Sequence, residues 1–317
     1  MLSRNPWRLR VMLVFCLWML AGVNGAFTVH AEDLCTWTAS LDGDWNRAGN
    51  WSCGHIPTNT DTVVIGPAPM PARVTAAATA ATLIIEAGGE LFYNAGAGVD
   101  FAVGAFTIAD GGRYIHKRTA TNPISGSNRA FAPNSTVEIQ SFSSPSTALP
   151  IFGNLTVSNT TAIQFSGKLG QVAGVFTKKG GGELRLSAAD SVSLTIAGNL
   201  EILSGTLLMQ SINTNTAVTL TVAGDVRIAS GAALLRGTSV SPWIHTVGGD
   251  WIDEGLYTPG AAGNSTVHFN ASGAAHLTRL AATAGDTETF CNVSIAAGTV
   301  LDTGTDFIAV GAWARRP

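Results

Sequence analysis

The feature that most constrains the fold is a sequence repeat of about 25 residues. The segments LTIAGNLEILSGTLL, LTVAGDVRIASGAALL and HTVGGDWIDEG align on Gly198, Gly224 and Gly249, which are 26 and 25 residues apart. An earlier pair, LIIEAGGELFY and FTIADGGRYIH, is offset by 23 residues. Each unit combines two short strand-like runs around a glycine corner. Because one such unit cannot bury its apolar side chains alone, successive units must stack, which predicts a solenoid.

Apolar and polar residues alternate within each unit. In LTIAGNLEI we expect Leu194, Ile196, Leu200 and Ile202 to point inward and Thr195 to face solvent. Glycine and asparagine suit the corners because they tolerate the left-handed backbone conformation of sharp bends. Only 12% of the residues are charged, which argues against a helical bundle. The sequence therefore predicts an all-β solenoid.

Residues 1–31 have the composition of a secretory signal peptide. Arg4, Arg8 and Arg10 precede the apolar run VMLVFCLWMLAG, and VHA ends at Ala31. That run is short for a membrane span of about 20 residues, so we expect cleavage and no membrane span afterwards. The three arginines removed with it leave 15 basic and 21 acidic residues. This balance predicts no nucleic-acid partner, which would favour a basic surface.

Residues 32–65 are predicted to form an N-terminal cap, because the open apolar end of the first coil must be covered. Cys35 and Cys53 are close in sequence and flank a turn-rich loop, so we pair them in a disulfide. Closing this loop should stabilise the fold by roughly 3 kcal/mol. The residues predicted to pack in the cap or turn the chain out of it are Trp37, Trp45, Trp51, Pro57 and Asp61.

Trp45 and Trp51 have a second interpretation. In a secreted β protein, exposed and coplanar indoles would form a carbohydrate-binding platform, because their flat apolar faces can stack on sugar rings. The two interpretations make opposite predictions for the exposure of these side chains.

The stretch DWNRAGNWSCGHIPTNTDTVVI, followed by ATLIIEAGGELFY, resembles the opening of secreted bacterial surface proteins with right-handed parallel β-helix repeats. Downstream, GGDW, NSTVHFNASGA and FCNVSIAAGTVL resemble their repeat unit. A weaker likeness is to the eight-glycine extracellular domain, which shares the tryptophan-to-proline opening. The resemblance covers most of residues 35–310. It implies a right-handed parallel β-helix at the cell surface, with extracellular polysaccharide or surface proteins as partners, and it says little about activity.

No motif predicts a catalytic residue, a metal site or a cofactor. Asp42, Asp44 and Asn46 have the spacing of a calcium loop, but Arg47 and Cys53 occupy the positions that require glycine and glutamate. The acidic residues are scattered along the sequence. The main alternative is a polysaccharide lyase or glycosidase on the same fold, which predicts Asp or Glu clustered with Arg or Lys on one outer face.

The remaining expectations concern the repeats at residues 66–317. His245 and His268 lie in strand-like segments and are expected to face outward, and Cys291 is expected to be buried as a small hydrophobic residue. The C-terminal AVGAWARRP shows no sorting signal and no capping pattern, as expected for the front part of a longer surface protein. The favoured function is a secreted or cell-surface structural or adhesive module without catalytic activity.

Overall fold

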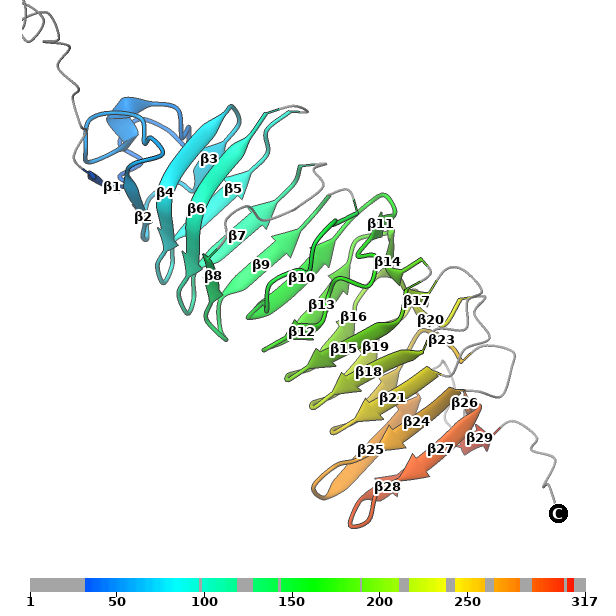
Figure 1. The fold of residues 1–317 in the computed structure, drawn as a ribbon. Coiled ribbons are helices and arrows are strands. Elements are labelled where there is room, and N and C mark those ends of the chain that lie inside the picture. The colour runs from blue at the N-terminus through cyan, green and yellow to red at the C-terminus, as the bar shows by residue number, and fades with distance from the viewer. Residues whose placement is uncertain are drawn as a thin grey trace, which may run out of the picture. The chain divides into compact units, whose positions relative to one another are not determined.

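The structure is a computed structural model that describes residues 32–96, 99–118, 128–141, 144–188, 190–210, 217–237, 243–259, 265–279, 287–304 and 307–310. The chain divides into two units, Met1–Glu32 and Asp33–Pro317. The predicted signal peptide at residues 1–31 lies outside the described residues. The second unit is a parallel β-solenoid (Figure 1), as the repeat predicts.

The strands of the solenoid form four sheets of stacked parallel strands and one parallel pair. Sheet 1 contains β1 (Leu34–Thr36), β2 (Thr62–Ile65), β4 (Ala78–Ile85), β6 (Phe101–Ile108) and β8 (Asn128–Phe131). Sheet 2 contains β3 (Ala72–Val74), β5 (Glu90–Tyr93), β7 (Arg113–His116), β9 (Thr136–Ile139), β10 (Asn154–Ser158), β13 (Phe176–Lys179), β16 (Leu200–Ile202), β19 (Val226–Ile228), β22 (Trp251–Asp253), β25 (Ala274–Arg279) and β28 (Val300–Asp302).

The other two sheets belong to the second half of the solenoid. Sheet 3 contains β11 (Ile163–Gln164), β14 (Glu183–Ser187), β17 (Gly205–Gln210), β20 (Ala232–Leu235) and β23 (Leu256–Thr258). Sheet 4 contains β12 (Gln171–Val172), β15 (Val192–Ile196), β18 (Val218–Val222), β21 (Trp243–Val247), β24 (Ser265–Phe269) and β27 (Asn292–Ile295). The parallel pair is β26 (Thr287–Phe290) with β29 (Phe307–Val310). A short 3-10 helix, η1, covers Ala48–Asn50. Among the described residues, no helix has the length and apolar character to cross a membrane.

The cross-section of the coil changes along the chain. From β2 to β9 each coil has two strands, one in sheet 1 and one in sheet 2. From β10 to β24 each coil passes through sheets 2, 3 and 4 in turn, and after β25 and β28 the strands of the separate pair, β26 and β29, take the place of sheet 3. Phe152 joins the two parts, because its ring stacks on that of Phe131 in β8 and its backbone bridges to Val172 in β12. Sheet 4 therefore continues the side of the solenoid on which sheet 1 ends.

The alternation of apolar and polar residues places the core inside the coils. Leu194, Ile196, Leu200 and Ile202 are buried, whereas Thr195 is exposed, as predicted. Each apolar residue lies in register with one in the next coil, for example Ile196 with Val222. The core is thus a set of apolar columns that run from coil to coil.

The repeat glycines occupy the corner between sheets 4 and 2. The side-chain Oδ1 of Asn199 accepts a hydrogen bond of 2.9 Å from the backbone N–H of Asp225, and Asp225 Oδ1 accepts one of 2.8 Å from that of Asp250. A Cβ atom on Gly224 would lie 2.1 Å from Asn199 Oδ1, and one on Gly249 would lie 2.1 Å from Asp225 Oδ1. The repeated Gly-Asn or Gly-Asp pair is therefore a corner ladder, in which glycine leaves room for the Asn or Asp side chain of the preceding coil.

Two expectations for the repeats are wrong. His245 is 2% exposed and faces inward, in register with Leu220 and Val267, because alternation in β21 gives it the same orientation as Val247. His268 is partly exposed on the outer side, as expected. Cys291 is partly exposed rather than buried, because it lies between β26 and β27 and not within a strand.

Candidate functional site

The N-terminal cap is built on strand β1. Cys35 in β1 lies in parallel register with Val63 in β2, and the chain then returns along the other side of β1. On that side the backbone N–H of Thr38 donates to the carbonyl of Asn50 at 2.9 Å, and that of Ser52 to the carbonyl of Thr36 at 3.0 Å. The outer edge of β1 is therefore paired with its own chain instead of being open to aggregation.

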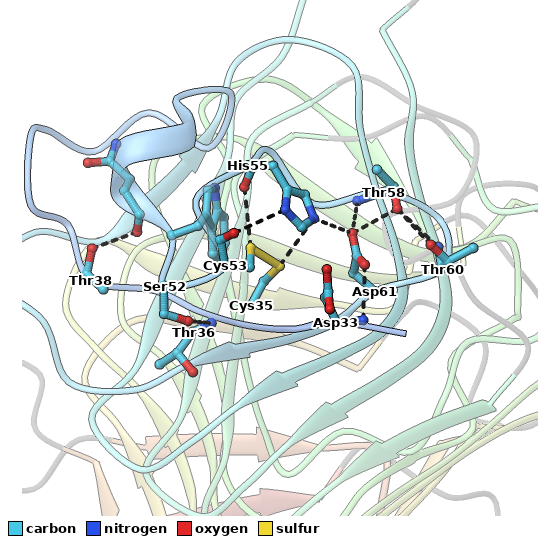
Figure 2. The surroundings of a disulfide bond; sticks show 12 residues. Asp33, Cys35, Thr36, Thr38, Ser52, Cys53, His55, Thr58, Thr60 and Asp61 are labelled. Carbon is cyan, nitrogen blue, oxygen red and sulfur yellow. Dashed lines mark hydrogen bonds and ion pairs between the residues drawn. A yellow bond between two sulfur atoms is a disulfide. The ribbon is translucent and has the colours of Figure 1, made fainter. Parts of the chain in front are cut away.

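The predicted disulfide between Cys35 and Cys53 is present, with Cα atoms 4.9 Å apart (Figure 2). It joins β1 to the end of the returning segment across 18 residues of sequence. Cys35 is fully buried and Cys53 is partly exposed. The bond thus pins the cap at the N-terminal end of the solenoid.

The three cap tryptophans pack against one another. Trp37, Trp45 and Trp51 are 4%, 0% and 3% exposed. Trp51 contacts both other indoles edge to face, at centroid distances of 4.9 and 4.7 Å and interplanar angles of 67° and 70°. Its Nε1 donates to the carbonyl of Trp45 at 2.8 Å. Trp45 and Trp51 therefore lack the exposed and coplanar faces that a carbohydrate platform requires.

The acidic residues of the predicted loop are used in turns. Asp42 Oδ1 accepts hydrogen bonds from the backbone N–H of Asp44 at 2.9 Å and from Asn50 Nδ2 at 2.8 Å, and Asp44 Oδ1 accepts one from the N–H of Asn46 at 3.0 Å. The bonds from Asp44 and Asn50, with the charge of Arg47, lower the pKa of the Asp42 carboxyl. The spacing of these residues thus reflects consecutive Asx turns.

His55 and Asp61 lie beside the disulfide (Figure 2). His55 Nε2 is 3.2 Å from Asp61 Oδ2 and 3.9 Å from Cys35 Sγ. Asp61, 1% exposed, also accepts hydrogen bonds from the N–H and hydroxyl of Thr58 at 2.7 and 2.8 Å. Burial alone would raise the pKa of Asp61, but the hydrogen bonds from Thr58, His55 and Asp33 outweigh it and lower this pKa. Asp61 therefore remains a carboxylate, while Pro57, which is buried, precedes this turn.

Two groups of side chains in the cap bring potential metal ligands within 4.8 Å of one another: Cys35, Cys53 and His55, and Asp33, His55 and Asp61. The sulfur atoms of the first group form the disulfide, so they cannot act as thiolate ligands. In the second group both carboxylate oxygens of Asp61 already accept hydrogen bonds. Neither group is arranged as a ready cation site.

A cluster of charged side chains lies on the outer face of sheet 2. Arg113 Nη2 is 2.6 Å from Glu138 Oε2, and Arg113 Nη1 is 3.2 Å from Glu90 Oε1. Lys179 Nζ is 3.9 Å from the same oxygen of Glu138, and the Ser158 hydroxyl donates to Glu138 Oε1 at 2.5 Å. We call Glu90, Arg113, Glu138 and Lys179 the outer cluster. It comes from four strands, β5, β7, β9 and β13.

Glu138 is the centre of the outer cluster, because it pairs with both Arg113 and Lys179. It is also only 5% exposed. Burial alone would raise its pKa, but the hydrogen bonds from Ser158, Gln140 and Arg113, with the charge of Lys179, lower it. Its ionised form is thus held by several donors. The cluster could not be predicted from the sequence, because its members lie in neighbouring coils and only Arg113 belongs to the basic segment RYIHKR at 113–118.

Ionisable side chains also lie inside the coils. His116 Nε2 donates to the carbonyl of Arg118 at 2.9 Å, and burial lowers the pKa of His116 to about 4. Burial lowers the pKa of His245 to about 3, and neither of its ring nitrogens has a hydrogen-bond partner within the described part of the chain. Lys178 Nζ donates to the carbonyls of Lys179 and Gly180 at 2.9 and 2.8 Å, and burial lowers its pKa to about 8. These side chains are buried, so a change in their protonation affects the stability of the fold.

Comparison with known proteins finds one family model that is similar to part of the chain. Residues 36–169 match the model of a domain of unknown function (DUF8693). This match begins in β1 and ends between β11 and β12, so it covers the cap and the two-stranded coils. No curated protein and no solved structure matches the chain.

Proposed function

We propose that this chain is a secreted or cell-surface structural module that serves adhesion and has no catalytic role. The observation that carries the proposal is the Cys35–Cys53 disulfide, because disulfides persist mainly in oxidising compartments outside the cytosol. The signal-peptide pattern at residues 1–31 supports export. The likeness to bacterial surface proteins with β-helix repeats supports the adhesive role.

The outer face of sheet 4 supports extracellular polysaccharide as the partner. Thr195, Thr221 and Thr246 lie in register on three successive strands, and each is at least partly exposed. Neighbouring strands place such residues about 4.8 Å apart. Hydroxyl groups donate and accept hydrogen bonds, so this row presents both kinds of partner to the hydroxyls of a sugar chain.

Export is tested by expressing the full sequence in a bacterial host and sequencing the N-terminus of the exported protein. We expect it to begin at Glu32, with Cys35 and Cys53 protected from alkylation until a reductant is added. A protein that keeps Met1 and carries free thiols at both positions in the cell would contradict the proposal.

Adhesion is tested by co-sedimentation with a panel of insoluble polysaccharides. Replacing Thr195, Thr221 and Thr246 together by valine removes the hydroxyls and nearly preserves side-chain shape, and it should reduce binding. Thr177→Val, on the outer face of sheet 2, is the matched control and should bind normally. Equal binding by both variants would exclude sheet 4 as the contact surface.

A second candidate function is a polysaccharide lyase or glycosidase, and the outer cluster favours it. Glu90 and Glu138 flank Arg113 on one outer face, which is the kind of grouping that such an enzyme would need. Turnover on a panel of neutral and acidic polysaccharides, lost in Glu138→Gln, would establish this activity. Turnover that survives in Glu138→Gln would exclude the outer cluster as its site.

A further inference from the structure

The contacts of His55 point to a role for the cap disulfide beyond stabilisation. Its Nδ1 is 3.2 Å from the carbonyl oxygen of Cys53, and its Nε2 is 3.2 Å from Asp61 Oδ2 (Figure 2). Both oxygens are acceptors, so a proton on either ring nitrogen of His55 can be donated to one of them. The same Nε2 is 3.9 Å from Cys35 Sγ. A proton donor therefore lies beside one sulfur of the bond.

The two cysteines differ in their surroundings. Cys35 is fully buried next to His55, whereas Cys53 is partly exposed. Thiol–disulfide exchange needs access to the sulfur that is attacked, and it is faster when the departing thiolate is stabilised. The sulfur of the more exposed cysteine suits attack, and the sulfur next to the His55 ring suits departure.

We propose that Cys35–Cys53 is an exchangeable disulfide that an external dithiol opens at Cys53, with Cys35 as the leaving thiolate. A thiolate of the dithiol attacks Cys53 Sγ and forms a mixed disulfide. The bond between the two cysteines breaks, and its electron pair passes to Cys35 Sγ. The protonated Nε2 of His55 donates a hydrogen bond to this thiolate or gives it the proton, and the Asp61 carboxylate orients the ring. The second thiolate of the dithiol then closes the dithiol's own disulfide and releases Cys53 as a thiolate.

The rest of the cap has its own bonds, which keep the exchange local. Asn50, fully buried, accepts hydrogen bonds at Oδ1 from the N–H groups of Leu41 and Asp42, at 2.9 and 3.2 Å. Its Nδ2 donates to Asp42 Oδ1 and to the carbonyl of Asp44, at 2.8 and 2.9 Å. These contacts do not involve either cysteine. The reduced cap is therefore expected to stay in place, and the bond acts as a redox-sensitive latch.

The direction of opening is tested on oxidised protein in a Cys291→Ser background, which removes the third cysteine of the solenoid. A short exposure to glutathione is stopped with iodoacetamide, and each cysteine is assigned by peptide mass. We expect glutathione on Cys53 and the alkyl group on Cys35. Glutathione mainly on Cys35, or equally on both, would overturn the assignment.

The role of His55 is tested by the rate and the equilibrium extent of reduction by dithiothreitol. His55→Gln keeps a hydrogen-bond donor but has no proton that it can give to the thiolate, so both quantities should fall about tenfold. His276→Gln is the matched control, because His276 also pairs with a carboxylate, Asp250, at 3.1 Å but lies far from both cysteines in sequence. Circular dichroism verifies that each variant is folded. Reduction of His55→Gln at the wild-type rate and extent would exclude this role.

Discussion

At the residue scale, the corner ladder explains why the repeat keeps glycine before Asn or Asp. A methyl group on Gly249 would lie 2.1 Å from Asp225 Oδ1, the atom that accepts the N–H of Asp250. In the next coil the position of Gly249 is occupied by Ala275. There the backbone forms a strand instead of a bend, because β25 already begins at Ala274. The glycine is thus required only where the corner bends tightly against the side chain below.

Gly249→Ala should lower the free energy of unfolding by about 2–4 kcal/mol, because it combines overpacking with the loss of a partly buried hydrogen bond. Chemical denaturation measures the change. Gly170→Ala is the control: no heavy atom lies within 4 Å of its added Cβ, so it should change stability by less than about 0.5 kcal/mol. The double variant with Asp225→Ala should lose less than the sum of the two single changes, since the clashing oxygen is gone. Additive effects would contradict the ladder.

The cap makes a separate prediction at the same scale. Trp51→Ala should cost about 3–5 kcal/mol, because the indole is buried between Trp37 and Trp45. Cys35→Ser should cost about 2–4 kcal/mol through the lost loop constraint. Thermal unfolding beside a glycan array separates packing from recognition. Normal melting of Trp51→Ala with loss of glycan binding would favour a sugar site.

At the element scale, the sequence predicts strands and their neighbours better than it predicts sheets. The similar segments NSTVEI, at 134–139, and NSTVHF, at 264–269, make equivalent pairings, since Thr136 aligns with Asn154 and Thr266 aligns with Asn292. The first pairing is in sheet 2 and the second is in sheet 4. Alternation fixes which side chains face inward, but it does not determine how many times a coil bends. The change from two to three strands per coil was therefore not predictable from the pattern.

The outer cluster was beyond sequence analysis for a related reason. Arg113 and its partners Glu90 and Glu138 are separated by 23 and 25 residues, and only the register of the coils brings them together. His245 is different, because strict alternation through Trp243 and Val247 predicts its inward orientation. The expected outward orientation is wrong because the place of His245 in the strand, and not the polarity of its ring, determines which way it faces.

Glu138→Gln tests whether the outer cluster ties coils together. Loss of the carboxylate leaves Arg113 and Lys179 without their shared partner, so we expect a loss of about 1–3 kcal/mol in unfolding free energy. Glu201→Gln is the control on the same face, because its carboxylate is partly exposed and accepts one hydrogen bond of 3.3 Å, from Thr177. Equal stability of both variants, measured by denaturant titration, would mean that the cluster contributes little to the fold.

At the scale of the whole solenoid, each coil depends on its two neighbours, so a weak point in one coil affects the stack. His116 and His245 make their coils weak points at low pH, because burial lowers the pKa values of these two side chains to about 4 and about 3. Both values lie below the value of about 6.5 for an unfolded histidine. Below pH 6.5 the unfolded chain therefore binds protons that the folded chain does not, and stability falls as the pH falls towards these values.

Replacing His245 by leucine isolates one of these contributions. Leucine matches Leu220, which occupies the same inward column one coil earlier, so the variant should fold with the apolar column complete. Each buried histidine should account for a loss of about 1.4 kcal/mol for every pH unit below 6.5. Denaturant unfolding between pH 7 and pH 4.5 should therefore show an unfolding free energy that falls less steeply with falling pH for His245→Leu than for the wild type.

Leu220→Ile is the control, because it changes packing in that column without removing an ionisable group. Its unfolding free energy should have the same pH dependence as that of the wild type. If His245→Leu keeps the wild-type slope, the ring of His245 must take up its proton without unfolding, and the acid sensitivity of the solenoid must arise elsewhere.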